Sequence, residues 1–437
     1  MRISSTLYFQ TGLNSINKQQ SDLMHLFQQV GSGKRMITAA DDPLAAAQSI
    51  TLSQAQGMNK RFAENREVAS RVLNEEESIL NSITSQLQDV KTRLVEAGNG
   101  SLSDADRATL ADSLRSSQQA LLGLANSTDS SGQYLFSGSQ GLVAPFQQEG
   151  ASISYQGDRI DRNIQVDQTR QLPSTDNGFD VFSRATPGVN VFLSAGNANN
   201  TGTGQIAQPT ISNPKLAENV LDFEISFTDD STYSITTRVF DDFTGAINTT
   251  TLSGIPYDAS KGAGVIALPL EVDDEGNTLT ESGISISFEG APAAGDEFSV
   301  QRATSSAIGA YGQTDVNLFN TLEDVIQALE TPTANDPASQ AQLRNVLNGA
   351  MQRIDINYNN VLTVRASVGA RMNEIDALKA NGSLQALHIS SELGRLEDLD
   401  YIAASTQLEL RSSALEAASL AFKKIQNTSL FALTARG

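Results

Sequence analysis

The two ends of the chain carry matching apolar stripes, and the sequence between them has a different pattern. Near the start, side chains recur at spacings of three and four, at Leu13, Ile16, Gln20, Leu23, Phe27 and Val30. Near the end, the same rhythm runs through Tyr401, Ala404, Leu408, Leu415, Ala418, Phe422 and Ile425, with Arg411 as the polar exception. This spacing is typical of a helix that packs along another helix. The chain is therefore predicted to bring its termini together or to offer them to neighbouring molecules, which favours an assembly subunit over an enzyme.

Local signals predict two further helices in the first part of the chain. Asp42-Pro43 is a strong helix start, because a carboxylate caps free N–H groups and proline fits the first helical position. The apolar spacing then continues to about Ala97. Ser103 and Asp106 have the spacing of a capping box at the start of the next helix. We predict a long helix followed by a shorter one that turns back on it.

The middle of the chain changes to the alternating pattern of β-strands. Residues 221–240 alternate on both sides of an Asp-Asp-Ser turn, which predicts a hairpin, and residues 283–290 repeat the pattern. Helical spacing returns near Val316. Pro337 is predicted to open another long helix that ends at Asn381-Gly382, and a last helix is expected from about Ser383 to the C-terminus.

These patterns predict an α+β multidomain fold in which both chain ends form a long-helix coiled coil or bundle, with an inserted β-rich middle domain. Residues 1–42 and 383–437 are assigned to the two halves of a terminal coiled-coil domain. Residues 43–134 and 306–382 are assigned to the two parts of a long-helix bundle domain, and residues 135–305 to a β-rich outer domain. The helical parts on either side are expected to pack together, since each is apolar on one face.

The residue types that enzymes use are scarce. The chain has no cysteine, two histidines and a net charge of −20 at pH 7. The acidic surplus lies mainly in residues 149–302, with 22 acidic side chains against 8 basic ones. This balance argues against nucleic acid as a partner, and no segment approaches the ~20 apolar residues of a membrane span. We expect no catalytic residue, no cofactor and no bound metal.

Two acidic runs are candidates for cation sites. Glu397, Asp398 and Asp400 lie close together, but carboxylates near a helix end are more often solvated or paired. The run DDEG at 273–276 lacks the remaining ligand spacing of a calcium loop, so a turn is favoured. Neither His25 nor His388 has metal-binding spacing around it, so structural roles are expected for both.

Several short motifs resemble the flagellin superfamily and, within it, the hook–filament junction proteins. DDPLAA at 41–46 resembles the N-terminal signature of the superfamily. QYLFSG at 133–138, YQGD at 155–158 and NGFDVF at 177–182 resemble the junction proteins in particular. SVGARMNEID at 367–376 and LEDLDYIAA at 396–404 are similar to their C-terminal pattern. The motifs occur in the order of the family.

The resemblance implies a structural, non-enzymatic subunit of the bacterial flagellum that forms the ring joining hook to filament. The implied partners are other copies of the chain, another hook-associated protein on the hook side and flagellin on the filament side. A cytoplasmic export chaperone would hold the C-terminal segment before export. The protein would then be extracellular and exported without a cleavable signal peptide.

The residues predicted to form the assembly interface are Leu13, Ile16, Leu23, Phe27, Leu408, Leu415, Phe422 and Ile425. Three other interpretations stay open. The chain could be a flagellin that builds the filament itself, although QYLFSG and the Tyr-x-Gly-Asp motif argue against this. It could be a secreted protein that binds or degrades carbohydrate through carboxylates of its β domain. The stripes could also belong to an ordinary intramolecular bundle without any assembly role.

Overall fold

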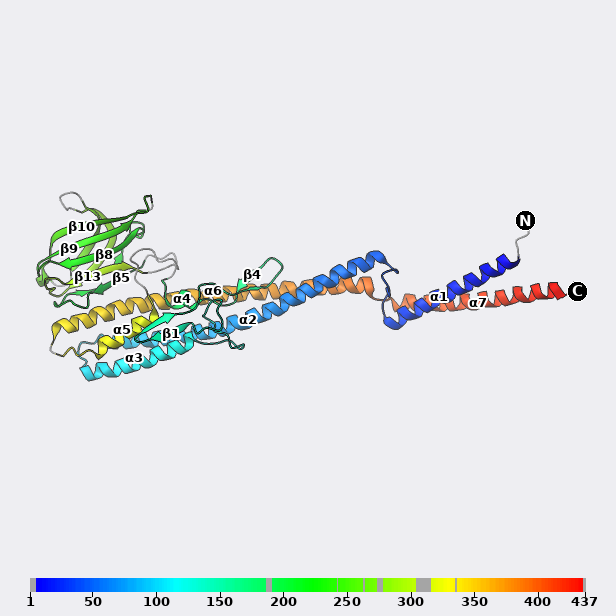
Figure 1. The fold of residues 1–437 in the computed structure, drawn as a ribbon, viewed down its shortest axis with the longest axis horizontal. Helices are drawn as coiled ribbons and strands as arrows, with labels where there is room; N and C mark the ends of the chain where they lie inside the picture. The colour runs from blue at the N-terminus through cyan, green and yellow to red at the C-terminus, as the bar shows by residue number, and fades with distance from the viewer. Residues whose placement is uncertain are drawn as a thin grey trace. The chain divides into compact units, whose positions relative to one another are not determined.

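The computed structural model describes residues 5–185, 191–241, 243–261, 264–272, 278–303, 316–334 and 336–434. The chain divides into two compact units. Residues 1–66 and 376–437 form one, here called the terminal unit, and residues 67–375 form the other, the central unit. The helices are α1 (Ser5–Ser32), α2 (Pro43–Ala97), α3 (Asp104–Ala125), the short α4 (Gly178–Phe182), α5 (Leu318–Glu330), α6 (Pro337–Glu397) and α7 (Tyr401–Thr434) (Figure 1). Along the sequence, helices precede and follow a β-rich middle, so the predicted fold class is confirmed. The finer division into five segments stays a prediction.

The helix starts that the sequence predicted are present. Ala45 N donates to Asp42 Oδ1 at 3.0 Å, so Asp42 caps α2 as expected. Ser103 caps α3, and its backbone N–H and Asp106 complete the capping box. Pro337 opens α6. Each of these signals lies within four residues of the bond it makes, which is why it could be read locally.

The predicted helix end at Asn381-Gly382 is wrong, because α6 continues to Glu397. Gly382 serves close packing instead. The Asn59 side chain of α2 donates to Gly382 O at 2.8 Å, and a Cβ on Gly382 would lie 2.3 Å from Arg66 Nη2. Glycine therefore lets α2 and α6 approach inside the terminal unit. The actual break between the last two helices falls at residues 398–400.

Alanine at Gly382 is expected to weaken this contact. Arg66 is only 3% exposed, so its guanidinium has little room to move away from a new methyl group. We expect a loss of about 1–3 kcal/mol, the usual cost of overpacking. Gly57→Ala is the matched control, because a Cβ there meets nothing within 4 Å and should stabilise α2 by up to about 1 kcal/mol. Thermal unfolding followed by circular dichroism compares the two, and shifts of the same sign would contradict the contact.

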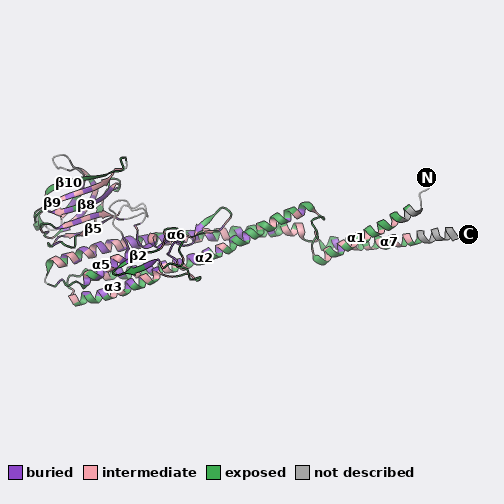
Figure 2. Ribbon diagram, viewed as in Figure 1, coloured by how far each residue is buried: buried purple, intermediate pink, exposed green. Residues whose placement is uncertain are grey.

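The helices of the central unit share an apolar core. Leu80, Ile83, Leu87, Val90 and Leu94 of α2 are fully buried, at the spacing that the sequence predicted. In α5 and α6, the buried positions include Leu322, Val325, Ile354, Val361 and Val368. Helices α3 and α5 lie side by side. Figure 2 shows buried residues along these helices and in the sheets.

The larger sheets form a β-sandwich. Its strands are β5 (Phe192–Gly196), β6 (Gln205–Ile206), β7 (Thr210–Ile211), β8 (Val220–Phe227), β9 (Thr232–Phe240), β10 (Ile247–Pro256), β11 (Gly264–Val272), β12 (Thr278–Glu289) and β13 (Glu297–Arg302), with a 3-10 turn at Ala259–Lys261. One sheet has the order β10-β9-β8-β13-β5, and the other β11-β12-β6, with β7 also paired to β12. The predicted hairpin is β8 and β9, with Ile225 opposite Ile235. The two sheets enclose one apolar core that includes Phe223, Phe227, Phe288 and Phe298. The acidic run at 273–276 lies outside the described residues.

A segment before the sandwich packs on the helices of the central unit. It contains two small antiparallel ribbons, β1 (Phe146–Glu149) with β2 (Ser152–Tyr155) and β3 (Asn163–Gln165) with β4 (Gln171–Pro173). Three motifs of the junction-protein resemblance meet here around Phe146. Its ring centroid lies 5.3 Å from that of Tyr155, 5.4 Å from Phe182 and 4.8 Å from Phe319 of α5. Tyr155 Oη donates to Phe136 O at 3.0 Å. The motifs therefore join this segment to the helices.

A buried cluster of charged side chains also binds the segment before the sandwich to the long helices. Arg371 of α6 pairs with Asp176 and donates to Pro173 O at 3.1 Å. Glu76 of α2 is fully buried and accepts from Asp176 N at 3.0 Å. Burial raises the pKa of the Glu76 carboxyl well above its ordinary value, and the nearby Asp176 adds to this effect. Two carboxyl groups thus share one guanidinium at this point.

This cluster predicts a stability that falls with rising pH. The folded-state pKa of Glu76 is raised, so its contribution is fully present below the unfolded pKa and is lost as the pH rises through the folded value. Glu76→Gln keeps an oxygen acceptor for Asp176 N without a charge. We expect urea midpoints of the wild type to fall more on going from mildly acidic to alkaline pH than those of Glu76→Gln. Parallel pH profiles would contradict the prediction.

Candidate functional site: the terminal helix pair

Helices α1 and α7 run antiparallel, side by side, within the terminal unit (Figure 1). A Cβ on Gly12 would lie 3.2 Å from two ring carbons of Phe422. Further along, Asp22 Oδ2 lies 3.2 Å from an Arg411 guanidinium nitrogen. A Cβ on Gly33, just after α1, would lie 2.9 Å from Tyr401 Oη. Residue numbers rise along one helix as they fall along the other, so the two chain ends form one helix pair.

The breaks that precede α2 and follow α6 are bonded to each other. Arg35 N donates to Glu397 O at 2.7 Å, and Leu399 N donates to Gly33 O at 2.9 Å. Lys34 Nζ lies 2.8 Å from Glu397 Oε2, and Ser49 Oγ donates to the same carboxylate. The hydrogen bond from Lys34 lowers the pKa of Glu397. The two breaks therefore form a single joint at the base of the helix pair.

The acidic residues near this joint have structural partners. Asp400 Oδ1 accepts from Ile402 N at 3.0 Å and from Ala403 N at 3.1 Å, so it caps α7. His25 Nε2 lies 3.0 Å from Asp41 Oδ1. Asp41 Oδ2 accepts from Ile37 N and Thr38 N, and these backbone donors lower the Asp41 pKa to about 2. These contacts agree with the structural roles favoured for His25 and for Asp400.

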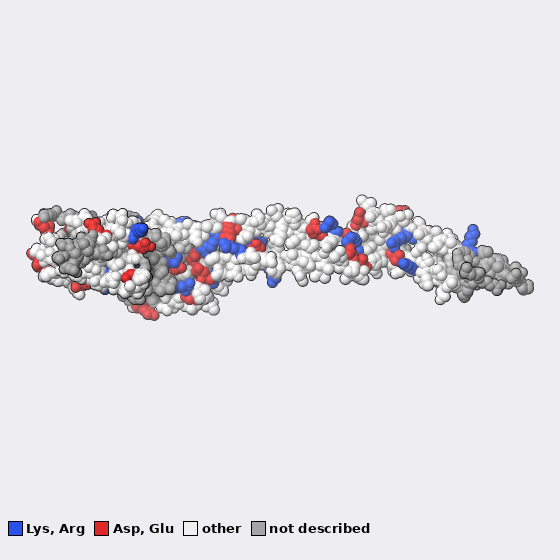
Figure 3. Space-filling model, turned by 90° about the horizontal axis from the view of Figure 1, so that it is seen from above, with Lys and Arg blue, Asp and Glu red and all other residues white. Residues whose placement is uncertain are grey.

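The terminal unit has little apolar core of its own. Among the described residues, its buried apolar side chains are Leu26, Ala45, Phe62, Ile389 and Ala404, and each keeps 4% or more of its surface exposed. In contrast, fourteen of the twenty-four large apolar side chains that are exposed in the described part of the chain lie in this unit. Asp22 is the one acidic side chain of α1, and Lys18 is its one lysine or arginine. Figure 3 shows acidic and basic side chains as well as uncharged surface along this face. Among its described residues, the terminal unit therefore exposes more large apolar side chains than it buries.

The predicted interface residues fall into two groups. Ile16, Leu23, Leu408, Leu415 and Phe422 are half-buried, and the contact at Gly12 places Phe422 on the side facing α1. Leu13 and Phe27 are exposed, at 47% and 52%. Ile425 lies in α7, but its side chain is outside the described part. The structure does not test an assembly role for any of them, so that role stays a prediction.

Sequence reasoning missed apolar side chains that are exposed outside the predicted stripe of each helix. Leu7 and Met24 of α1 are 60% and 63% exposed. On α7, the exposed side chains Leu410, Ala414, Ala417 and Ala421 follow one another at spacings of four, three and four. This second stripe is readable in the sequence as a second 3–4 rhythm, shifted from the first. Two stripes on one helix allow packing on two sides.

Comparison with known proteins indicates the class of protein that this chain resembles. Residues 3–141 match the model of the bacterial flagellin N-terminal helical region. Flagellar hook-associated protein 3 of Escherichia coli K12 is 27% identical over 434 residues, covering 99% of this chain and 100% of that protein. A crystal structure of FlgL from Xanthomonas campestris superposes with a TM-score of 0.62 at 25% identity, covering 78% of this chain and 99% of that chain. The phase 1 flagellin of Salmonella naestved is 28% identical over only 34% of this chain.

The paired terminal helices and these matches define a flagellin-like structural protein of the bacterial flagellum. Within that class the chain is a homologue of flagellar hook-associated protein 3, since this similarity extends over both terminal helices and the middle domain. The filament flagellin is not favoured, because its match is partial. The carbohydrate-active alternative is not favoured either, since the homologues are structural flagellar proteins. No helix in the described ranges is long and apolar enough to cross a membrane.

Proposed function

We propose that the chain is a structural subunit of the ring that joins the flagellar hook to the filament, and that α1 and α7 are its assembly elements. The observation that carries this proposal is the surface of the helix pair. Leu13, Met24, Phe27, Leu410 and Leu420 each expose about half or more of their surface on two helices that bury few side chains of their own. Such a surface on a water-exposed monomer is typical of an interface with partners.

The energy available from this surface fits assembly. Full burial of a large apolar side chain contributes about 1.5–3 kcal/mol, so several such residues per subunit offset the cost of immobilising the subunit. The same apolar surface would leave the helix pair weakly held in an isolated molecule. Ordering would then be completed by neighbours, as in other segments that fold on binding.

The proposal includes the partners and the location. Neighbours in the ring are other copies of this chain. The hook side contacts another hook-associated protein and the filament side contacts flagellin, while an export chaperone binds the C-terminal segment in the cytoplasm. The assembled protein is extracellular, reaches its site without a cleavable signal peptide, and has no enzymatic activity. The homology to flagellar hook-associated protein 3 supports these assignments.

A pair of aspartate substitutions tests the proposal. Phe27→Asp places a charge on the exposed face of α1, whereas Phe243→Asp makes the same change at a residue of the sandwich that is 98% exposed. Both variants should fold, since neither side chain is in a core. In a strain lacking its own hook-associated protein 3, we expect the wild-type chain and Phe243→Asp to support filament attachment and swimming, and Phe27→Asp to fail. Swimming with Phe27→Asp, or failure of Phe243→Asp alone, would contradict an interface on the terminal helices.

A further inference from the structure

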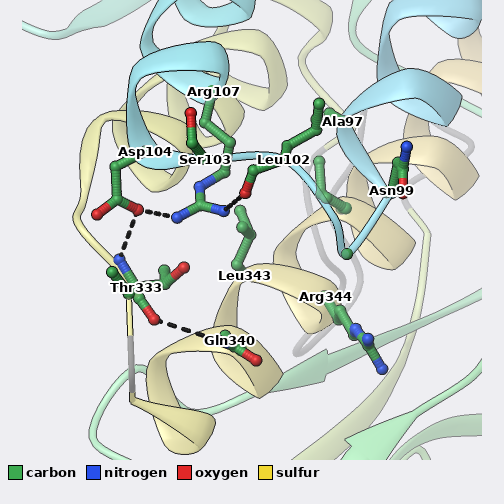
Figure 4. Close-up of a pocket in the computed structure, with 14 residues that line it drawn as sticks. Ala97, Asn99, Leu102, Ser103, Asp104, Arg107, Thr333, Gln340, Leu343 and Arg344 are labelled. Carbon is green, nitrogen blue, oxygen red and sulfur yellow. Dashed lines mark hydrogen bonds and ion pairs between the residues drawn. The ribbon is translucent and has the colours of Figure 1, made fainter.

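A small cavity lies at one end of the helices of the central unit, where two connections meet. It is lined by the turn between α2 and α3, the start of α3, the linker before α6 and the first turns of α6. Its volume is about 110 Å³. A water molecule needs roughly 10–15 Å³ measured in this way, so the cavity has room for a small molecule of several heavy atoms. Figure 4 shows Arg107, Thr333, Leu343 and Arg344 around this space. We call it the bundle-end cavity.

Two buried polar atoms of the cavity lining lack a hydrogen-bond partner. Thr333 is 2% exposed, and its Oγ1 has no partner. Arg107 is 7% exposed, and its Nε has none. A buried polar group without a partner costs about 1–3 kcal/mol, so two donors on one cavity favour the binding of a group that accepts hydrogen bonds.

Three acceptors in the lining are already in use. Leu102 O accepts from Arg107 Nη1 at 2.8 Å. Asp104 Oδ1 accepts from Arg107 Nη2 and also from Thr333 N, the latter at 3.2 Å. Thr333 O accepts from Gln340 Nε2 at 3.3 Å, as the dashed lines in Figure 4 show. The Arg107 Nε–H and the Thr333 hydroxyl have no hydrogen-bond partner. The Arg344 guanidinium makes one hydrogen bond, to Gln205 Oε1, which is long at 3.4 Å.

Free donors and a positive balance select the ligand chemistry. The charged side chains of the lining are one acid, Asp104, and two bases, Arg107 and Arg344. A guanidinium recognises planar or tetrahedral oxyanions through directed N–H bonds. We propose that the bundle-end cavity binds one small oxyanion, a phosphate or a small carboxylate, through Arg107 Nε, Thr333 Oγ1 and Arg344. The bound anion would tie the α2–α3 turn to the linker before α6.

This site is independent of the terminal helices and of the proposed function. Its direct test is a titration of the full-length protein, labelled with ¹⁵N-arginine, with phosphate and separately with acetate. Chloride at equal ionic strength is the reference. We expect the Arg107 Nε–H resonance to move with saturation for one or both oxyanions and not for chloride. Comparison of phosphate with acetate identifies which oxyanion the cavity prefers.

Two variants separate the site from general salt effects. Thr333→Val replaces the hydroxyl by a methyl group of similar size, and Arg344→Gln removes a charge from an exposed side chain, so both should fold. Each is expected to weaken oxyanion binding at least about tenfold, the usual effect of losing one hydrogen bond to a charged group. Calorimetric titration of the same variants gives an independent readout. Shifts that never saturate, that chloride reproduces, or that both variants retain would show that the cavity holds only water and would overturn the proposal.

Discussion

Phe422→Asp is expected to separate α1 from α7 and to abolish assembly while leaving the β-sandwich folded. The Phe422 ring lies so close to Gly12 that a single added carbon there would be 3.2 Å away. A carboxylate at this position would lose the apolar contact and would have to keep its water, which the neighbouring helix excludes. The sandwich has its own core of buried side chains in the central unit and should be unaffected.

The absence of cysteine in the chain makes the separation measurable. Cysteines introduced at Asp22 and Arg411, which lie opposite one another, can be joined by a short thiol-specific crosslinker. The yield of crosslinked monomer should fall sharply in Phe422→Asp. Phe422→Leu is the control, because it keeps an apolar side chain and should keep both the crosslink and ring formation. Ring formation or swimming with Phe422→Asp would refute the role of this contact.

Much of the helical architecture could be predicted because its signals are local. Asp42 with Pro43 and Ser103 with Asp106 act over one helical turn, and the structure has both starts where they were expected. Gly382 failed as a helix end because its reason is distant in sequence. The partners that need a glycine there are Asn59 and Arg66 of α2, more than three hundred residues earlier. A pattern confined to neighbouring residues cannot contain that information.

For the same reason, the candidate site could be predicted from the sequence only in part. The stripe through Ile16, Leu23, Leu408 and Phe422 was readable, and these side chains are half-buried in the terminal unit. The sequence could not say which apolar residues pair within the chain and which remain for neighbours. That division depends on the register of α1 against α7, which contacts such as Gly12 with Phe422 set. Once the register is known, the exposed face with Met24 and Leu410 becomes visible.

The sequence alone gives no physical reason for the residues of the junction-protein motifs. The structure supplies one. The rings of Phe146 and Tyr155 contact each other at a tilted angle, and both belong to the segment that packs on α5. In the C-terminal motif SVGARMNEID, Arg371 holds Asp176, and Glu374 pairs with Arg170. The motifs therefore mark places where chain segments that are distant in sequence are fastened to the long helices.

Arg371→Ala is expected to destabilise the central unit more than any surface substitution. Arg371 is 7% exposed, and its guanidinium is the cation that faces the carboxyl groups of Asp176 and the fully buried Glu76. Without it, Asp176 would be a poorly compensated charge in a buried site, and Pro173 O would lose a hydrogen bond. Removal of one partner from a buried ion pair costs about 3–5 kcal/mol. We expect a loss of that size in urea unfolding.

Arg170→Ala is the matched control for this prediction. Arg170 also pairs with a carboxylate and also joins the same segment to α6, with Nε 2.5 Å from Glu374 Oε1. Its side chain is 53% exposed, so water replaces the lost partner and the expected cost is below about 1 kcal/mol. Equal losses in the two variants would mean that burial does not distinguish the pairs. A large loss in Arg371→Ala alone would show that this single guanidinium fastens the segment between α2 and α6, because both substitutions remove a guanidinium that joins this segment to α6.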